Sequence, residues 1–146
     1  MPDTQFFSRE SATALGTEVK TALALSKLRL CASPFVPNAF TTKAELVAAE
    51  AAFDGYPAGG YPLAAWSGPL NDPAGGAIIT SPLVNAAYGP AEEPPVTASI
   101  SAGWVEDTSG DVRLIFTYDP VRPMLAEGDG WPIIAQMVYG RNLPTV

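Results

Sequence analysis

The sequence predicts a mainly β fold: a single-domain sandwich or jelly-roll-like barrel with one short α-helix and an extended N-terminal arm. A chain of 146 residues has the size of one domain. Its 15 prolines and 13 glycines are spread along the chain, so they indicate many turns rather than a low-complexity tract. Between these breaks, short runs alternate apolar and polar residues, and only one helix has a clear start and stop.

Residues 1–26 are predicted to form an N-terminal arm or a helix, and residues 27–146 the mainly β domain. Ser8 could begin a helix, although Gly16 and several threonines weaken it. The apolar face of that helix would carry residues at helical spacing: Ala12, Leu15, Val19, Ala22 and Leu23. The alternative is an arm that becomes ordered only on a neighbouring molecule.

A strand followed by a helix is predicted between residues 27 and 57. Lys27–Cys31 places leucines at every second position, which is typical of a half-buried strand. The helix is expected at Thr42–Phe53, because Thr42 and Glu45 fit a capping box and a run of alanines follows. Gly55 can take a positive φ and so end the helix.

The last third of the chain gives the strongest β pattern. Strands are predicted at Val96–Glu106 and Val112–Tyr118, joined by a tight hairpin loop at 107–111. Pro120, after Asp119, is expected to end the second of these strands. A closing strand is predicted at Ile133–Tyr139, central in its sheet because both of its faces carry apolar residues.

The charge pattern excludes several classes of function. The formal net charge is −7, and no basic residue occurs between Lys43 and Arg113, so no Lys/Arg stripe is available for nucleic acid. We expect no membrane contact, because there is no long apolar run, and no signal peptide. Only 16 % of residues are charged, against roughly 25 % in ordinary domains, which favours a subunit whose surface is partly covered by partners.

No catalytic, cofactor-binding or metal-binding residue can be named from the sequence. The chain has no histidine, and Cys31 is expected to be a small buried hydrophobe. The loops with Asp107, Asp111 and Asp129 could bind Ca²⁺ weakly, but turn chemistry accounts for these aspartates as well. No pair of carboxylates stands out as the acid and base of a glycosidase.

Aromatic residues next to proline and glycine breaks are the candidate subunit-interface residues. Tyrosine and tryptophan are enriched in protein interfaces, although the same rings could line a sugar site. The candidates are Phe53, Tyr56, Tyr61, Trp66, Tyr88 and Trp131.

The order of these elements resembles that of small structural proteins of tailed bacteriophages. The resemblance rests on the strand Lys27–Cys31, its proline-spaced connector, the helix, the late hairpin and the closing strand. Its most specific piece is Phe53-Asp54-Gly55-Tyr56, followed by Trp66-Ser67-Gly68-Pro69.

The resemblance implies a capsid cement or decoration protein of the virion, made in the host cytoplasm. Such a protein would bind the major capsid protein and copies of itself, as a trimer, without catalysis. One alternative is a tail component, such as a fibre, baseplate or receptor-binding protein. Another, from a different class, is a carbohydrate-binding module or a glycan-active enzyme.

Overall fold

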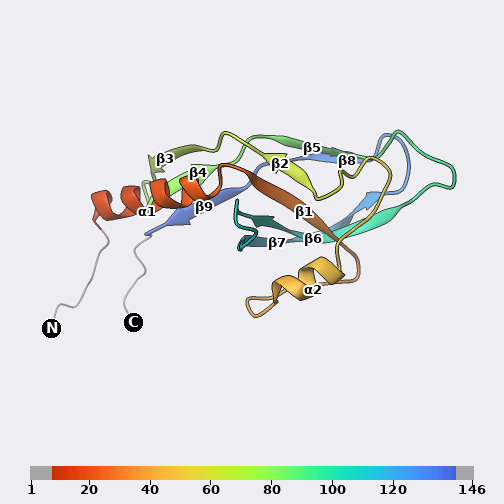
Figure 1. Ribbon diagram of the computed structural model, residues 1–146, viewed down its shortest axis with the longest axis horizontal. Helices are drawn as coiled ribbons and strands as arrows, with labels where there is room; N and C mark the ends of the chain where they lie inside the picture. Colours follow the sequence, from red (N-terminus) through yellow and green to blue (C-terminus); the bar gives the residue numbers. More distant parts are fainter. Residues whose placement is uncertain (1–7, 141–146) are drawn as a thin grey trace.

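The computed structural model describes residues 8–140, which form a β sandwich with two helices (Figure 1). The mainly β prediction is confirmed, and the described strands do not close into a barrel. The helices are α1 (Arg9–Ala22) and α2 (Lys43–Ala48). The strands are β1 (Ser26–Ala32), β2 (Tyr61–Leu63), β3 (Ser67–Asn71), β4 (Ala77–Thr80), β5 (Val84–Ala87), β6 (Ala98–Glu106), β7 (Val112–Met124), β8 (Gly130–Ile133) and β9 (Gln136–Tyr139).

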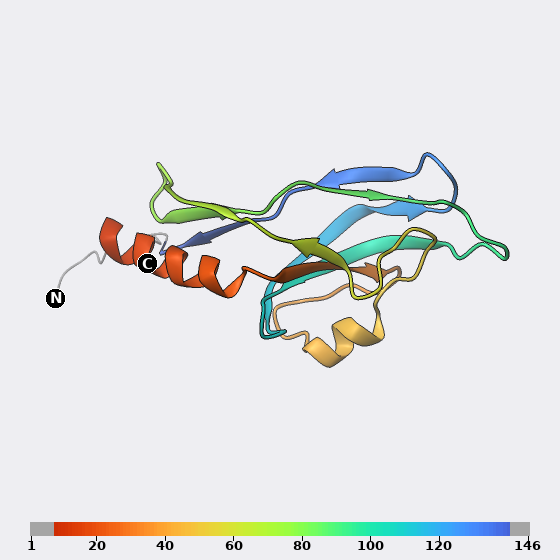
Figure 2. The same cartoon turned by 45° about the horizontal axis from the view of Figure 1, so that its top comes forward.

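The lower layer in Figure 2 is a four-stranded antiparallel sheet in the order β2-β1-β6-β7, which we call the lower sheet. Strand β6 lies between β1 and β7, and residues 100–106 are buried on both faces. One face of this sheet contacts the other layer, and α2 covers part of the opposite face (Figure 2). The strand predicted at Val96–Glu106 is therefore the central strand of this sheet, although it begins at Ala98.

The upper layer consists of a three-stranded sheet, β3-β4-β9, and a two-stranded sheet, β5-β8. The strand pairing between these two sheets is interrupted at Ser81 and Ala135. There the Ser81 amide donates to the Ala135 carbonyl (2.8 Å), and the Ala135 amide donates to Ser81 Oγ (2.9 Å). The prediction of one central strand at Ile133–Tyr139 is therefore wrong. Strands β8 and β9 belong to different sheets, and β9 is an edge strand.

Strand β7 continues through Pro120, contrary to the break predicted there. Its register with β6 shifts at this point, because Ala102 pairs with Thr117 whereas Ile100 pairs with Arg122. Residues 118–121 of this edge strand therefore lie opposite the single residue Ser101 of β6 and form a large bulge. Proline has no amide hydrogen to donate, and a bulge at an edge requires none.

The main core lies between the two layers, and a smaller one lies beneath α2. Leu28, Leu30 and Val105 are fully buried in the main core. Cys31 and Trp104, on the other face of the same sheet, are fully buried with Leu46 of α2. The expected burial of Cys31 is confirmed.

Residues 9–22 form a helix and not an extended arm. Ser8 caps α1 by accepting a hydrogen bond from the Ser11 amide (3.0 Å). The helix extends the lower layer beneath β3 and β4 (Figure 2), where Gly16 allows close approach: a Cβ there would lie 3.0 Å from Pro69 Cβ. Residues 1–7 of the predicted arm lie outside the described residues.

Helix α2 has the predicted capping box but ends at Ala48, before the expected Phe53. Glu45 Oε2 accepts from the Thr42 amide (2.7 Å), and Thr42 Oγ1 accepts from the Glu45 amide (3.3 Å). The next alanines leave the helix because they pair with β1, where the Ala51 amide donates to the Leu30 carbonyl (2.8 Å). Tertiary pairing here overrides the helix propensity of alanine.

Candidate functional site

The Phe53-Asp54-Gly55-Tyr56 segment forms hydrogen bonds with the connector between β5 and β6, residues 88–97. Asp54 is buried, and its carboxylate accepts hydrogen bonds from Tyr88 Oη (3.1 Å) and from the amides of Glu92 (2.8 Å) and Val96 (3.2 Å). The Glu92 amide, followed by the Val96 amide and Tyr88, lowers the pKa of Asp54 below its usual value. Both carboxylate oxygens of Asp54 therefore accept hydrogen bonds from the chain itself, and Asp54 has a structural role in fixing this connector.

Arg29 joins two carboxylates on the outer side of the lower sheet. Its guanidinium contacts Glu106 Oε1 (2.9 Å) and both carboxylate oxygens of Glu50 (3.1 Å). Tyr56 Oη donates to Glu50 (2.9 Å) and accepts from the Leu30 amide (3.2 Å). Because Arg29 forms ion pairs with both carboxylates, this cluster ties β1, β6 and the segment after α2 together.

The other groups considered for chemistry also have structural partners. Asp107 accepts from the amides of Ser109 (2.8 Å) and Asp111 (3.0 Å) and from Arg113 Nε (2.7 Å). Asp129 accepts from two amides of its own loop. Burial raises the pKa of the Cys31 thiol to about 12, so it is not a thiolate at neutral pH. Among residues 8–140, no three His, Cys, Asp or Glu side chains are grouped to hold a metal ion.

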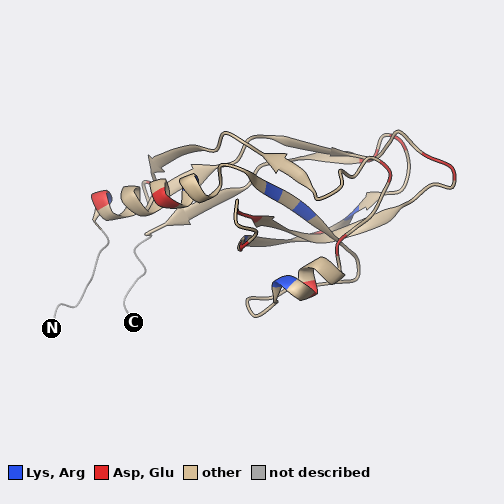
Figure 3. Cartoon of the chain, viewed as in Figure 1, with Lys and Arg blue, Asp and Glu red and all other residues tan. Residues whose placement is uncertain are grey.

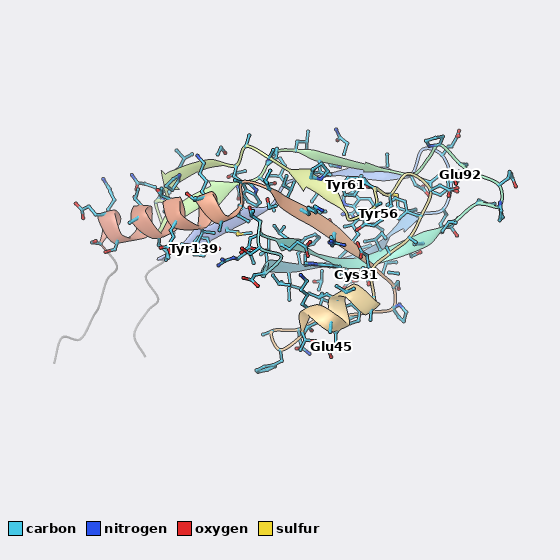
Figure 4. The ribbon with its side chains drawn as sticks, in the orientation of Figure 1. Cys31, Glu45, Tyr56, Tyr61, Glu92 and Tyr139 are labelled. Carbon is cyan, nitrogen blue, oxygen red and sulfur yellow. The ribbon has the colours of Figure 1, made fainter. Side chains whose placement is uncertain are left out.

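Four of the six candidate interface aromatics lie in the core of the single chain: Phe53, Tyr61, Trp66 and Tyr88. Figure 4 shows Tyr61 beside Tyr56, with ring centroids 5.6 Å apart. Trp66 donates its indole N–H to Ser26 Oγ (2.8 Å), and both residues are buried. These four rings pack mainly within their own chain.

The remaining two candidates are only partly buried and lie in different places. Tyr56 is part of the Arg29 cluster, whereas Trp131 on β8 donates its indole N–H to Tyr118 Oη (3.1 Å). Trp131 also lines a shallow hollow with Asn85 and Asp129. The six aromatics therefore do not form one surface.

A different surface, which we call the outer sheet face, lies on the upper layer. Strand register places Leu70 opposite Ile78 and Ile78 opposite Val138, in one row across β3, β4 and β9. Their neighbours Ile79 and Met137 point into the core, so this row points outward. Leu70 is 67 % exposed. The outer sheet face comprises Leu70, Ile78, Thr80, Leu83, Ile134, Gln136 and Val138.

The outer sheet face has no charged residue. None of the five strands of the upper layer contains Asp, Glu, Lys or Arg. Figure 3 shows the charged positions on α1, α2, the lower sheet and the loops instead. An antiparallel sheet with a solvated face normally alternates apolar and polar residues, and Leu70, Ile78 and Val138 depart from that pattern. An uncharged, apolar sheet face is suited to protein contact.

This face was not predicted from the sequence, because β4 and β9 have apolar residues on both sides. Ile78 and Ile79 are indistinguishable in sequence, although only Ile79 is fully buried. The usable signal was the absence of charge, since Asp72 is the only charged residue between Asp54 and Glu92. The absence of charge indicates which region of the chain forms the surface, but it does not indicate which side of the sheet faces outward.

No family model matches the chain, and no similar protein is found among curated sequences or solved structures. Neither α1 nor α2 has the length and apolar character that a membrane-spanning helix requires.

Proposed function

We propose that this chain is a structural protein of a tailed-phage virion, a cement or decoration subunit that binds the capsid shell and catalyses no reaction. The observation that carries the proposal is the outer sheet face, an apolar and uncharged surface on a chain of net charge −7. The resemblance of the element order to small phage structural proteins supplies the biological setting.

The outer sheet face fits a contact with a shell subunit for an electrostatic reason. Burying an unpaired charge at an interface costs several kcal/mol, roughly, whereas burying apolar side chains is favourable. Because the charges lie elsewhere, this face can press against another protein without burying any of them. The partner we propose is the major capsid protein, through an uncharged and apolar patch of its outer surface.

The carboxylates offer further support for a role in binding alone. Asp54, Asp107 and Asp129 accept two or more hydrogen bonds each from within the chain, and Arg29 forms ion pairs with Glu50 and Glu106. These groups hold loops and strands in place. A rigid scaffold with an apolar face is what a brace on a shell requires.

Binding to empty shells tests the proposal. The purified chain is mixed with empty capsids assembled from the major capsid protein of the same phage, and the bound fraction is measured by co-sedimentation. We expect saturable binding that Leu70→Lys weakens about tenfold or more, because the new charge would be buried at the contact. Leu125→Lys is the matched control, since Leu125 is 51 % exposed but lies outside the outer sheet face.

Two results would contradict the proposal. One is the absence of binding to empty shells, and the other is a Leu70→Lys variant that binds as well as the original chain. Imaging of the virion with the chain labelled would then test the tail alternative. A glycan screen tests the carbohydrate alternative, and Trp131→Ala is its informative variant because Trp66 is a core residue.

A further inference from the structure

Phe40 is the most exposed of the large apolar side chains that the structure describes. It is 91 % exposed, and Val36 in the same loop is 73 % exposed. The loop precedes α2 and projects from the lower layer, away from the body of the sandwich (Figure 1). Single exposed apolar residues are common on proteins, so exposure alone does not indicate a contact.

The loop that carries Phe40 is held in one conformation by its own hydrogen bonds. Asn38 Oδ1 accepts from the Phe40 amide (2.8 Å), Thr41 Oγ1 accepts from the Asn38 amide (2.8 Å), and the Thr41 amide donates to the Asn38 carbonyl (3.1 Å). Phe35, at the start of the loop, packs against the core beneath α2. An exposed aromatic on an ordered turn can bind a partner at a small entropic cost.

A hollow of about 390 Å³ lies directly beside this loop. Residues 37–39 line one side of it, and Ile115, Phe116 and Thr117 of β7 line the other. None of these residues is charged, and β7 is the edge strand of its sheet. The side chain of Ile115, on the α2 side of the sheet, is available for hydrophobic contact to an aromatic ring that enters it.

We infer that two copies of this chain pair through reciprocal insertion of Phe40, the ring of each copy filling the hollow between residues 37–39 and β7 of the other. The ring and the hollow adjoin each other on one chain and so form a single patch. A patch that contacts itself is related by a two-fold axis, which closes at two copies. A trimer, as the resemblance implies, would require two separate patches.

A second copy is a better occupant than the shell for two reasons. The first rests on the proposed function: the Phe40 loop lies below the lower layer, whereas the outer sheet face lies on the upper layer (Figure 2). A molecule bound to the shell by that face presents Phe40 on its opposite side. The second is charge, because residues 33–42 are uncharged and two chains of net charge −7 can meet there with little repulsion.

Sedimentation velocity across a wide range of protein concentration tests the pairing. We expect the unaltered chain to reach twice the 15.2 kDa mass of one copy. Phe40→Ala should raise the dissociation constant about a hundredfold, since each dimer loses two buried rings. Val36→Ala is the matched control: Val36 is exposed in the same loop but does not line the hollow, and its loss should leave the constant unchanged.

Disulfide trapping tests the proposed geometry. Two variants with one added cysteine each, Phe40→Cys and Thr117→Cys, are mixed and oxidised, while the fully buried Cys31 remains out of reach. The mixture is kept at a protein concentration well above the dissociation constant expected for a pair that has lost one Phe40 ring. A disulfide between the two variants under this condition supports the inference, and its absence overturns it. A strict monomer, a trimer, or a dimer that Phe40→Ala leaves intact would also overturn it. Shell binding, measured separately by co-sedimentation, would still report on the proposed function.

Discussion

At the scale of single residues, the tyrosine hydroxyls differ in whether they have a hydrogen-bond partner. Tyr88 Oη donates to Asp54, Tyr56 Oη donates to Glu50, and Tyr118 Oη accepts from Trp131. Tyr61 Oη is buried and has no hydrogen-bond partner among residues 8–140. Burial raises the pKa of Tyr61 to about 12, so its hydroxyl is neutral at physiological pH. A buried hydroxyl without a partner costs free energy of folding.

Replacing Tyr61 by Phe should therefore stabilise the protein. The ring remains in the core, and the cost of burying the hydroxyl disappears, which is a gain of about 1 kcal/mol. Thermal unfolding should show a Tm higher by about 3 °C, given the size of the chain. Tyr88→Phe is the control and should lower the Tm, because it removes the hydrogen bond to Asp54. A lower Tm for Tyr61→Phe would reveal a bound water or another partner at the hydroxyl.

At the scale of elements, the turns and helix caps that depend on residues close together in the sequence were predictable. The loop at 107–111 forms because Asp107 accepts from two nearby amides and Gly110 has a φ of +84°. The capping box of α2 likewise involves only Thr42 and Glu45, three residues apart. In both cases the residues that define the feature are neighbours in the sequence, so the pattern carries the information.

The predictions that were wrong concern elements whose bounds depend on residues far away in the sequence. Ile133–Tyr139 divides into β8 and β9 because Ser81, far away in the sequence, interrupts the pairing at Ala135. The expected helix end at Phe53 is wrong because Ala51 pairs with Leu30. The candidate site was missed for the same reason: whether Ile78 or Ile79 faces the core depends on which side of the sheet the other layer covers.

Gly103 in β6 shows how closely the elements approach one another. A Cβ at this position would lie 2.4 Å from Phe116 Cζ of β7 and 2.6 Å from the Arg29 carbonyl oxygen of β1. The ring could shift, but the carbonyl belongs to a paired backbone. Gly103→Ala should therefore destabilise the fold by about 2 kcal/mol through overpacking, measured by urea unfolding.

A double-mutant cycle identifies which neighbour obstructs the added methyl group. Phe116→Leu replaces the ring that covers Gly103 with a shorter side chain. Gly103→Ala should therefore lower the free energy of unfolding by less in that background than in the original chain. Part of the cost should remain because of the Arg29 carbonyl. Equal costs in both backgrounds would mean that Phe116 is not the obstacle.

At the scale of the whole molecule, charged and uncharged regions are separated. The upper-layer strands carry no charge, while aspartates secure loops elsewhere: Asp54 holds the connector before β6, and Asp107 holds the hairpin between β6 and β7. Burial raises the pKa of Asp107, but the hydrogen bond from Arg113 and those from its loop amides lower it overall. Stability of the whole fold is thus linked to the ionisation of these carboxylates.

The sign of this linkage gives a prediction for Asp54→Asn. The pKa of Asp54 is lower in the folded chain than its usual value of 3.8, so its stabilising effect is present above 3.8 and is lost as the pH falls through the folded value. At neutral pH the Asn variant should be the less stable chain, because an amide supplies one acceptor oxygen where the carboxylate supplies two. Below the folded pKa the original Asp54 is protonated, so the difference in the free energy of unfolding should shrink. Urea midpoints at neutral pH, near pH 5 and near pH 3 would measure it, with the exposed Asp119→Asn as control. A difference that stays constant across this range would mean that the carboxylate of Asp54 contributes no more in its charged form than in its neutral form.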